Sequence, residues 1–229
     1  GDWSSDVCSS DLGGYPRLEA EFYADGRYLF RSFREGLRAF LQEAKPKGVA
    51  FPAYYCESVV CFLSDLPIDI HRYHVSSDFM PTLQRLPPDT FLVYPNYYGA
   101  SDAAVRLVID IYGAERVILD YAQSLAKPPQ TVLGGNSLRK FFPVPDGAEF
   151  FSSLSLSRPK IKGVGAKGLA HIVEEERDSA YLRYLESEAQ MADKTLRGIS
   201  TEALIGLACM DRDNTRVVRK RNFDLFHAA

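Results

Sequence analysis

A carboxylate and an amide follow an apolar run in the middle of the chain. Within the segment "RVILDYA", Asp120 ends the apolar run, and Gln123 lies three residues further on. A carboxylate at the carboxyl end of a buried strand would lie beside a bound ligand. An Asp in a turn or at a helix N-cap would instead have a purely structural role. Both interpretations of Asp120 stand at this point.

The segment "GGNSLRKFFPVPDG" carries a lysine in an unusual setting. Gly134 and Gly135 permit a tight backbone, Ser137 offers a hydroxyl, and Lys140 stands between this polar loop and two phenylalanines. We expect a lysine so placed to lose part of its hydration, which suits an amine that forms a Schiff base. The alternative is an ordinary surface lysine beside a loop.

Ser32 stands where a predicted helix begins. The free N–H groups of the first turn and the helix dipole suit a phosphate group. A serine that merely caps its helix is the alternative.

Other pairs of reactive residues do not form predicted sites. His71 and His74 are three residues apart in a predicted strand, so they point to opposite faces and cannot share a metal ion. Cys56 and Cys61 follow a helical pattern, and we expect them to be core or near-core thiols. The four cysteines include no C-x-x-C pair, which favours reduced thiols and a cytoplasmic location.

Helices and strands alternate along the chain. Such alternation predicts an α/β domain with a largely parallel sheet, followed by C-terminal helices. Predicted strands span residues 48–52, 68–75, 90–98 and 116–122, and predicted helices span 31–45, 56–66, 101–113, 167–198 (ended by Gly198), 200–210 and 212–229.

Bulk composition excludes several classes of protein. The 229 residues are 46% hydrophobic and 25% charged, with a net charge of −3. This balance gives no field that would attract nucleic acid or an anionic membrane. No apolar run approaches the roughly 20 residues of a membrane span, and no P-loop, G-x-G-x-x-G or G-x-S-x-G motif is present.

In this order along the chain, the features resemble the DegT/DnrJ/StrS family of sugar aminotransferases, which are fold type I enzymes that depend on pyridoxal 5'-phosphate (PLP). The resemblance covers residues 13–229. The segments that carry it are "GGYPRLEAEF", "SFREGLRAFL", "FPAYYCESVV", "LDYAQSL" and "LRKFFPVPDGA".

The resemblance implies a role for each candidate residue near the cofactor ring. Asp120 would pair with the pyridine nitrogen and keep it protonated, so that the ring acts as an electron sink. Gln123 would lie against the cofactor near its phenolic oxygen. Lys140 would form the Schiff base and then move a proton between substrate and cofactor.

The resemblance also implies a phosphate site, and the chain departs from the family there and above the ring. Ser32, with the backbone of Phe33 and Arg34, would hold the phosphate, and Ser137 could add a hydroxyl. Phe33 replaces a glycine of the family and hinders close approach of the backbone. Cys56 replaces an aromatic residue that many members place over the ring. Its neighbour Tyr55 could substitute, but strand alternation predicts that Tyr55 points elsewhere.

We expect three segments in the chain. Residues 1–12 back-translate to a sequence that resembles a sequencing adapter, which predicts a non-native segment. Residues 13–160 would form the PLP-binding large domain. Residues 161–229 would be helical and lead to a small C-terminal domain that is missing, so this chain alone would be inactive, and the full-length protein would be a homodimer.

The expected function is transfer of an amino group from an amino-acid donor to a keto sugar, carried on a nucleotide, in polysaccharide or related biosynthesis. Two alternatives keep the same fold: a non-catalytic or regulatory relative, and a PLP-dependent sugar dehydratase. A nucleotide-binding Rossmann-like protein is a third alternative, against which the missing glycine fingerprint counts.

Overall fold

The computed structural model describes residues 26–125, 133–163 and 193–227, together with 181–182, 185–186 and 189. The predictions for residues 1–12, and most of the predicted helix 167–198, lie outside these residues.

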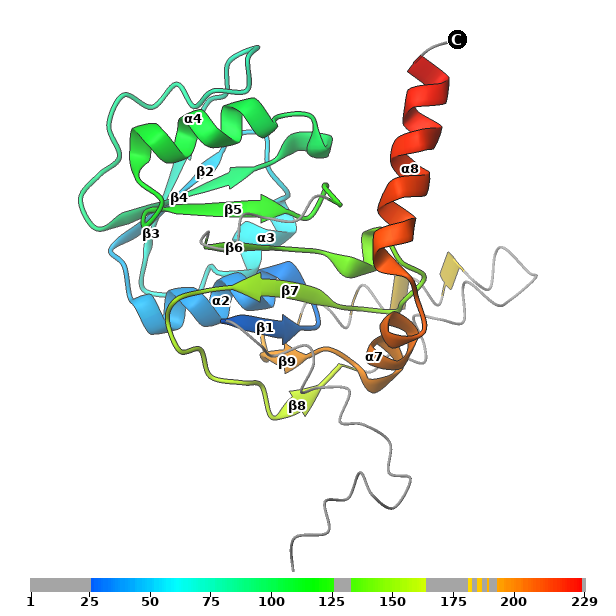
Figure 1. Ribbon diagram of the computed structural model, residues 1–229. Coiled ribbons are helices and arrows are strands. Elements are labelled where there is room, and N and C mark those ends of the chain that lie inside the picture. The colour runs from blue at the N-terminus through cyan, green and yellow to red at the C-terminus, as the bar shows by residue number, and fades with distance from the viewer. Residues whose placement is uncertain are drawn as a thin grey trace, which may run out of the picture.

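A seven-stranded mixed sheet forms the centre of the molecule (Figure 1). Its strand order is β1-β7-β6-β5-β4-β2-β3, and β7 runs antiparallel to both of its neighbours while the other six strands share one direction. The predicted α/β class with a mainly parallel sheet is therefore confirmed. The strands are β1 (Arg27–Phe30), β2 (Gly48–Pro52), β3 (Asp69–Tyr73), β4 (Thr90–Pro95), β5 (Val117–Tyr121), β6 (Gly134–Asn136) and β7 (Ala148–Phe151).

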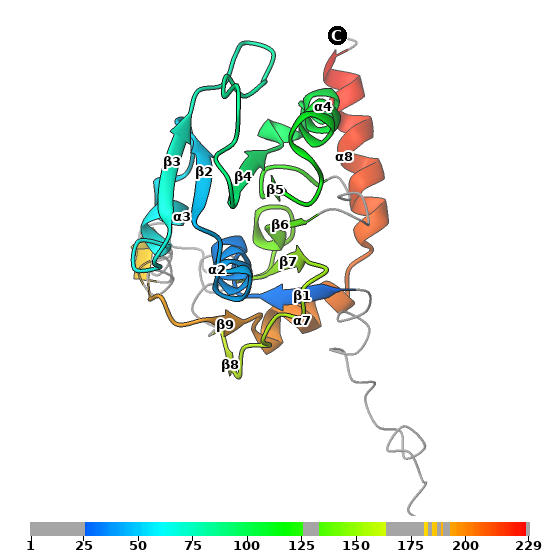
Figure 2. The same cartoon turned by 90° about the vertical axis from the view of Figure 1, so that its left-hand side faces the viewer.

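Helices cover both faces of this sheet. Figure 2 looks along the sheet, with α2 (Phe33–Ala44) on one side and α4 (Asp102–Tyr112) on the other. The short helix α3 (Glu57–Phe62) packs beside α2. Ser101 and Gly113 flank α4 as the sequence predicted, and the left-handed backbone at Gly113 ends that helix.

Alternation along the buried strands divides the core between the two faces. In β5, Val117 and Leu119 pack with the α4 side, whereas Ile118 packs with the α2 side. By the same alternation Asp120 belongs to the side of α2 and α3. Burial of both faces explains why these strands are continuously apolar.

The C-terminal part adds a third apolar cluster and an exposed helix. Helix α7 (Thr201–Ala208) packs Leu204 and Leu207 with Leu29 of β1. Helix α8 (Arg212–His227) runs past the carboxyl ends of the strands (Figure 1) and buries none of its residues. Two 3-10 turns, η2 (Tyr97–Gly99) and η3 (Leu138–Lys140), follow β4 and β6.

The prediction that Gly198 ends a long helix is wrong. The described residues between 181 and 189 are helical, but Gly198 lies in strand β9 (Arg197–Gly198), which pairs with β8 (Ile161–Lys162). Asp193 explains the change, because its carboxylate accepts hydrogen bonds from the N–H and the hydroxyl of Thr195. Such a local turn competes with helix continuation.

The prediction that Cys56 and Cys61 are core thiols is also wrong, because both are exposed. Helix α3 is shorter than predicted and buries the face that carries Val59, Val60 and Phe62. Cys61 lies off that face, and Cys56 precedes the helix at its N-cap.

Candidate functional site

The carboxyl ends of the parallel strands open onto a cavity of about 370 Å³. Segments that follow β1, β2, β4, β5 and β6 all contribute to its wall, as expected for an open parallel sheet. Its volume falls within the range of about 300–1,000 Å³ that small-molecule sites occupy. The lining residues are Ser32, Phe33, Arg34, Tyr54, Tyr55, Cys56, Ser58, Val59, Pro95, Tyr97, Asp120, Ala122, Gln123, Ser137, Arg139 and Lys140.

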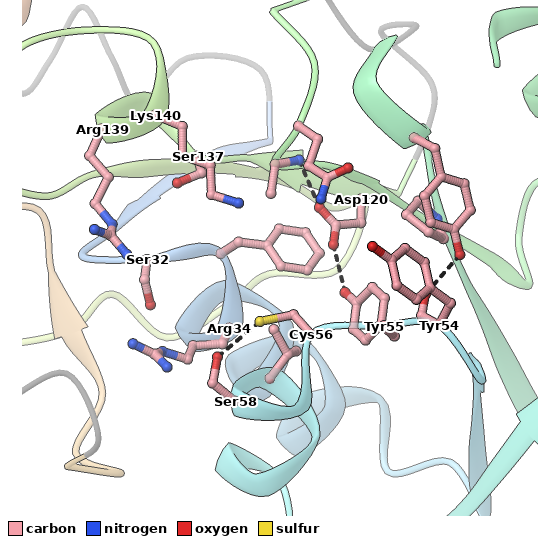
Figure 3. A pocket seen from close by; sticks show the side chains of 16 residues that line it. Ser32, Arg34, Tyr54, Tyr55, Cys56, Ser58, Asp120, Ser137, Arg139 and Lys140 are labelled. Carbon is pink, nitrogen blue, oxygen red and sulfur yellow. Dashed lines mark hydrogen bonds between the residues drawn. The ribbon is translucent and has the colours of Figure 1, made fainter. Parts of the chain in front are cut away.

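Asp120 lies at the inner side of this cavity with both carboxylate oxygens hydrogen-bonded (Figure 3). The backbone N–H of Ala122 donates to Oδ1 over 2.7 Å, and the hydroxyl of Tyr55 donates to Oδ2 over 2.6 Å. Burial raises the pKa of Asp120 above its ordinary value, while the Tyr55 and Ala122 hydrogen bonds and the charge of Lys140 act in the opposite direction. The carboxylate is thus held in place and lies within electrostatic reach of the lysine.

Tyr55 does not point away from the site, so the prediction from strand alternation is wrong. Strand β2 ends at Pro52, and Tyr55 lies in the following turn, where the two-residue period no longer applies. Its ring packs against Phe51 with centroids 5.2 Å apart, and its hydroxyl reaches Asp120. Burial, followed by the nearby Asp120, raises the pKa of Tyr55 well above its ordinary value, so this hydroxyl stays neutral and donates.

Ser137 and Lys140 come from the turn that follows β6 and lie side by side on another wall (Figure 3). Ser137 is buried, whereas Lys140 is exposed at the rim. The expected loss of hydration at Lys140 is therefore not observed. The two phenylalanines after it pack with the α7 cluster instead, Phe142 inside that cluster and Phe141 at its edge.

The N-terminus of α2 forms the wall that carries Ser32, Phe33 and Arg34. Ser32 stands at the N-cap position, but its hydroxyl donates to Glu35 Oε2 over 3.1 Å and makes no capping hydrogen bond. Burial raises the pKa of Glu35, and the neighbouring Arg31 guanidinium, 2.7 Å from Glu35 Oε1, opposes that shift. A phosphate at this helix end would compete with Glu35 for the Ser32 hydroxyl.

Gln123 lies in the turn after β5, where its Oε1 accepts a hydrogen bond from the backbone N–H of Tyr98 over 3.4 Å. Tyr98 has a left-handed backbone (φ 55°), which is uncommon for a residue other than glycine. The amide of Gln123 thus ties the β5 turn to the β4 turn at the edge of the cavity.

Several cavity residues were missed by sequence reasoning. Tyr54, Tyr97 and Arg139 line the wall, and the hydroxyl of Tyr97 donates to the carbonyl of Tyr54 over 2.9 Å. Tyr97 and Arg139 each follow a strand end in the structure, but Tyr97 lies inside the predicted strand 90–98 and no strand was predicted before Arg139. Cys56 also lines the cavity, with its Sγ 3.1 Å from the Ser58 hydroxyl.

The chemistry of these groups fits PLP. A buried carboxylate suits a protonated ring nitrogen, a primary amine at the rim suits an aldehyde carbon, and a helix N-terminus suits a phosphate. Asp120, Lys140 and the first turn of α2 would supply these three groups. Phe33 fits a phosphate site less well than glycine would, because it carries a side chain at the first position of that turn. Its ring packs against Phe150, with the ring centroids 5.9 Å apart.

No protein-family model and no curated protein sequence matches the chain. Solved structures with the same fold are found at low identity. Spr1654 from Streptococcus pneumoniae, assigned as a sugar aminotransferase and solved in its PMP form, is 12% identical with a TM-score of 0.55, over 87% of this chain and 59% of that one. Bna3p from Saccharomyces cerevisiae, assigned as a kynurenine aminotransferase, is 8% identical with a TM-score of 0.51. The match covers 94% of this chain and 52% of Bna3p.

These likenesses establish the fold, which is that of fold type I aminotransferases. The chain spans between about half and three fifths of the length of these two proteins. None of the described helices is both long and apolar enough to cross a membrane.

Proposed function

We propose that the chain is the cofactor-binding part of a PLP-dependent aminotransferase. The observation that carries this proposal is the convergence of Asp120, Lys140 and the first turn of α2 on one cavity, from segments far apart in the sequence. The shared fold with two aminotransferases supports it.

Each side chain would have a defined task in this function. Asp120 would hold a proton on the ring nitrogen of the cofactor. Lys140, at the rim, would bond to the aldehyde carbon and afterwards take up and return a proton at its amine. PLP, when bound, supplies a ring that accepts electrons from the carbon next to the substrate amine.

The phosphate and the remaining cavity wall involve the other predicted residues. The N–H groups of Phe33 and Arg34, together with the hydroxyls of Ser32 and Ser137, would hold the phosphate, and Gln123 would lie beside the phenolic oxygen. We further propose a keto sugar on a nucleotide as amino acceptor and a homodimer of the full-length protein, both on the resemblance of the motifs described above.

A cofactor-trapping experiment tests the lysine assignment. The purified chain is incubated with PLP, reduced with borohydride and digested, and the peptide that carries the reduced cofactor is identified by mass spectrometry. We expect the label on Lys140. Lys140→Ala should abolish the fixed label, whereas Lys160→Ala, at an exposed lysine outside the cavity, should retain it.

Label of equal intensity on Lys140→Ala protein would overturn the assignment of this lysine. Absence of bound PLP in the unreduced protein at millimolar cofactor would overturn the proposed function itself, in favour of a relative that keeps the fold without the cofactor. The Phe33 side chain at the phosphate position would explain such a result, because it hinders close approach of a phosphate to the backbone.

A further inference from the structure

The contact between Tyr55 and Asp120 is the shortest side-chain contact to the proposed catalytic groups. The distance from Tyr55 Oη to Asp120 Oδ2 is 2.6 Å, which is typical of a strong hydrogen bond to a carboxylate. Burial alone would favour the protonated, neutral carboxyl. The hydroxyl opposes burial, because an O–H donor stabilises the ionised form.

Tyr55 remains the donor and Asp120 the acceptor in this hydrogen bond. The high pKa of Tyr55, caused by burial and by the adjacent carboxylate, keeps its proton on the phenol oxygen through the physiological range. Packing of its ring against Phe51 fixes the direction of the O–H group. The second oxygen of Asp120 is held by the Ala122 N–H, so rotation of the carboxylate would break two bonds at once.

We propose that Tyr55 is a positioning residue that decides where the proton lies between Asp120 and the ring nitrogen of the cofactor. One proton is shared by the carboxylate oxygen and the nitrogen. With the Tyr55 hydroxyl donating to Oδ2, the carboxylate stays ionised and the proton stays on nitrogen. Without that hydroxyl, the proton moves from nitrogen to the carboxylate oxygen, and no other atom changes its charge.

Only the statement about the cofactor nitrogen rests on the proposed function. The effect of Tyr55 on the ionisation of Asp120 can be measured without cofactor. The first experiment is a carboxyl ¹³C NMR titration of the full chain labelled at aspartate, with the Asp120 signal assigned by its loss in Asp120→Asn. Tyr55→Phe should move the Asp120 midpoint to higher pH.

Tyr73 offers a matched control for the loss of the Tyr55 hydroxyl. Tyr73 in β3 is buried, and its hydroxyl donates to the carbonyl of Val93 over 2.7 Å. Tyr73→Phe removes a comparable buried hydroxyl and should leave the Asp120 midpoint in place. An equal shift in both variants would show a general effect of destabilisation and would overturn the inference.

A second variant keeps the experiment decisive if Tyr55→Phe does not fold. Incorporation of 3,5-difluorotyrosine at position 55 preserves the ring and makes the hydroxyl a stronger donor. We expect the Asp120 midpoint to move to lower pH, opposite to the effect of Tyr55→Phe. A midpoint that does not respond to the fluorinated side chain would refute the role of Tyr55.

The second experiment adds PLP labelled with ¹⁵N in the ring. The ring ¹⁵N signal should be that of a protonated nitrogen in the unmodified protein and should move toward the unprotonated value in Tyr55→Phe. If the chain binds no PLP but the Asp120 midpoint still shifts, the proposed function fails while the effect of Tyr55 on the carboxylate stands. If PLP binds and the ¹⁵N signal is unchanged by Tyr55→Phe, the inference fails while the proposed function stands.

Discussion

Asp120 and Asp146 are both buried carboxylates, with exposed fractions of 7% and 2%, but their surroundings differ. Asp120 faces the cavity and has a hydrogen bond to each oxygen. Asp146 lies outside the cavity lining, beneath helix α7, where its Oδ1 accepts from the backbone N–H of Ser200 over 2.9 Å. Its Oδ2 has no hydrogen-bond partner among the residues that the structure describes.

The difference shows how the same residue type serves two purposes. Burial raises the pKa of Asp120, and two donors oppose that shift by favouring the ionised form, which suits a positively charged group. Asp146 serves to anchor the start of α7, and burial raises its pKa to about 6. Replacement of Asp120 by a neutral residue should therefore weaken ligand binding. The same replacement at Asp146 should raise the free energy of unfolding.

The largest expected effect is that of Asp120→Asn on cofactor binding. The amide cannot hold a proton on the ring nitrogen, and a hydrogen bond to a charged partner contributes about 2–3 kcal/mol. We expect the affinity for PLP to fall roughly 30- to 150-fold, measured by equilibrium titration of the cofactor absorbance. Asp146→Asn should leave that affinity unchanged, and a comparable loss in both variants would remove the distinction between the two carboxylates.

How far the sequence predicts the site can be judged from Asp120 and Lys140. Asp120 was identified because it ends a predicted apolar strand, at the edge of the sheet where ligands gather. No strand was predicted before Ser137 and Lys140, which were identified by residue type and by the loop and phenylalanines around the lysine. Ser32 was identified by its place at a helix start. Their chemical roles remain proposals.

Other parts of the site depend on tertiary structure. Strand β6 consists of Gly134, Gly135 and Asn136, which have low strand propensity. It forms because Gly134, with φ of +150°, lies against the backbone of Leu119, where a Cβ atom would collide with the carbonyl oxygen. Tyr55 was misjudged for a related reason, since its direction is set by a turn and not by a strand period.

The next largest effect is that of Asp146→Asn on stability. Because the pKa of Asp146 is raised from 3.8 to about 6 in the folded state, that state binds more protons than the unfolded chain between about pH 4 and pH 6. The free energy of unfolding therefore falls as the pH rises through this window and stays lower above it. Asparagine removes this penalty and keeps an oxygen that accepts from the Ser200 N–H.

We expect Asp146→Asn to raise the free energy of unfolding at pH 7.5 by about 3 kcal/mol, measured by urea denaturation, with little change at pH 4. Asp110→Asn, on the exposed side of α4, should change stability by less than about 0.5 kcal/mol at either pH. Destabilisation of Asp146→Asn at pH 7.5 would mean that the charge of Asp146 has a partner that outweighs its burial.

The smallest effect concerns the helix that Asp146 anchors. The Ser200 side chain caps α7, because its hydroxyl oxygen accepts from the Ala203 N–H over 3.1 Å. Ser200→Ala removes this bond and the side-chain hydrogen bond by which Ser200 lowers the pKa of Asp146, but it keeps the backbone N–H that donates to Asp146. We expect a loss of about 1 kcal/mol in the free energy of unfolding, with Thr201→Ala, one residue further on and exposed, as the near-neutral control. The double variant Ser200→Ala/Asp146→Asn tests whether the cap and the carboxylate act independently at pH 7.5. If they do, its change in the free energy of unfolding equals the sum of the two single changes. A departure of more than about 0.5 kcal/mol from that sum would show that they act as one unit.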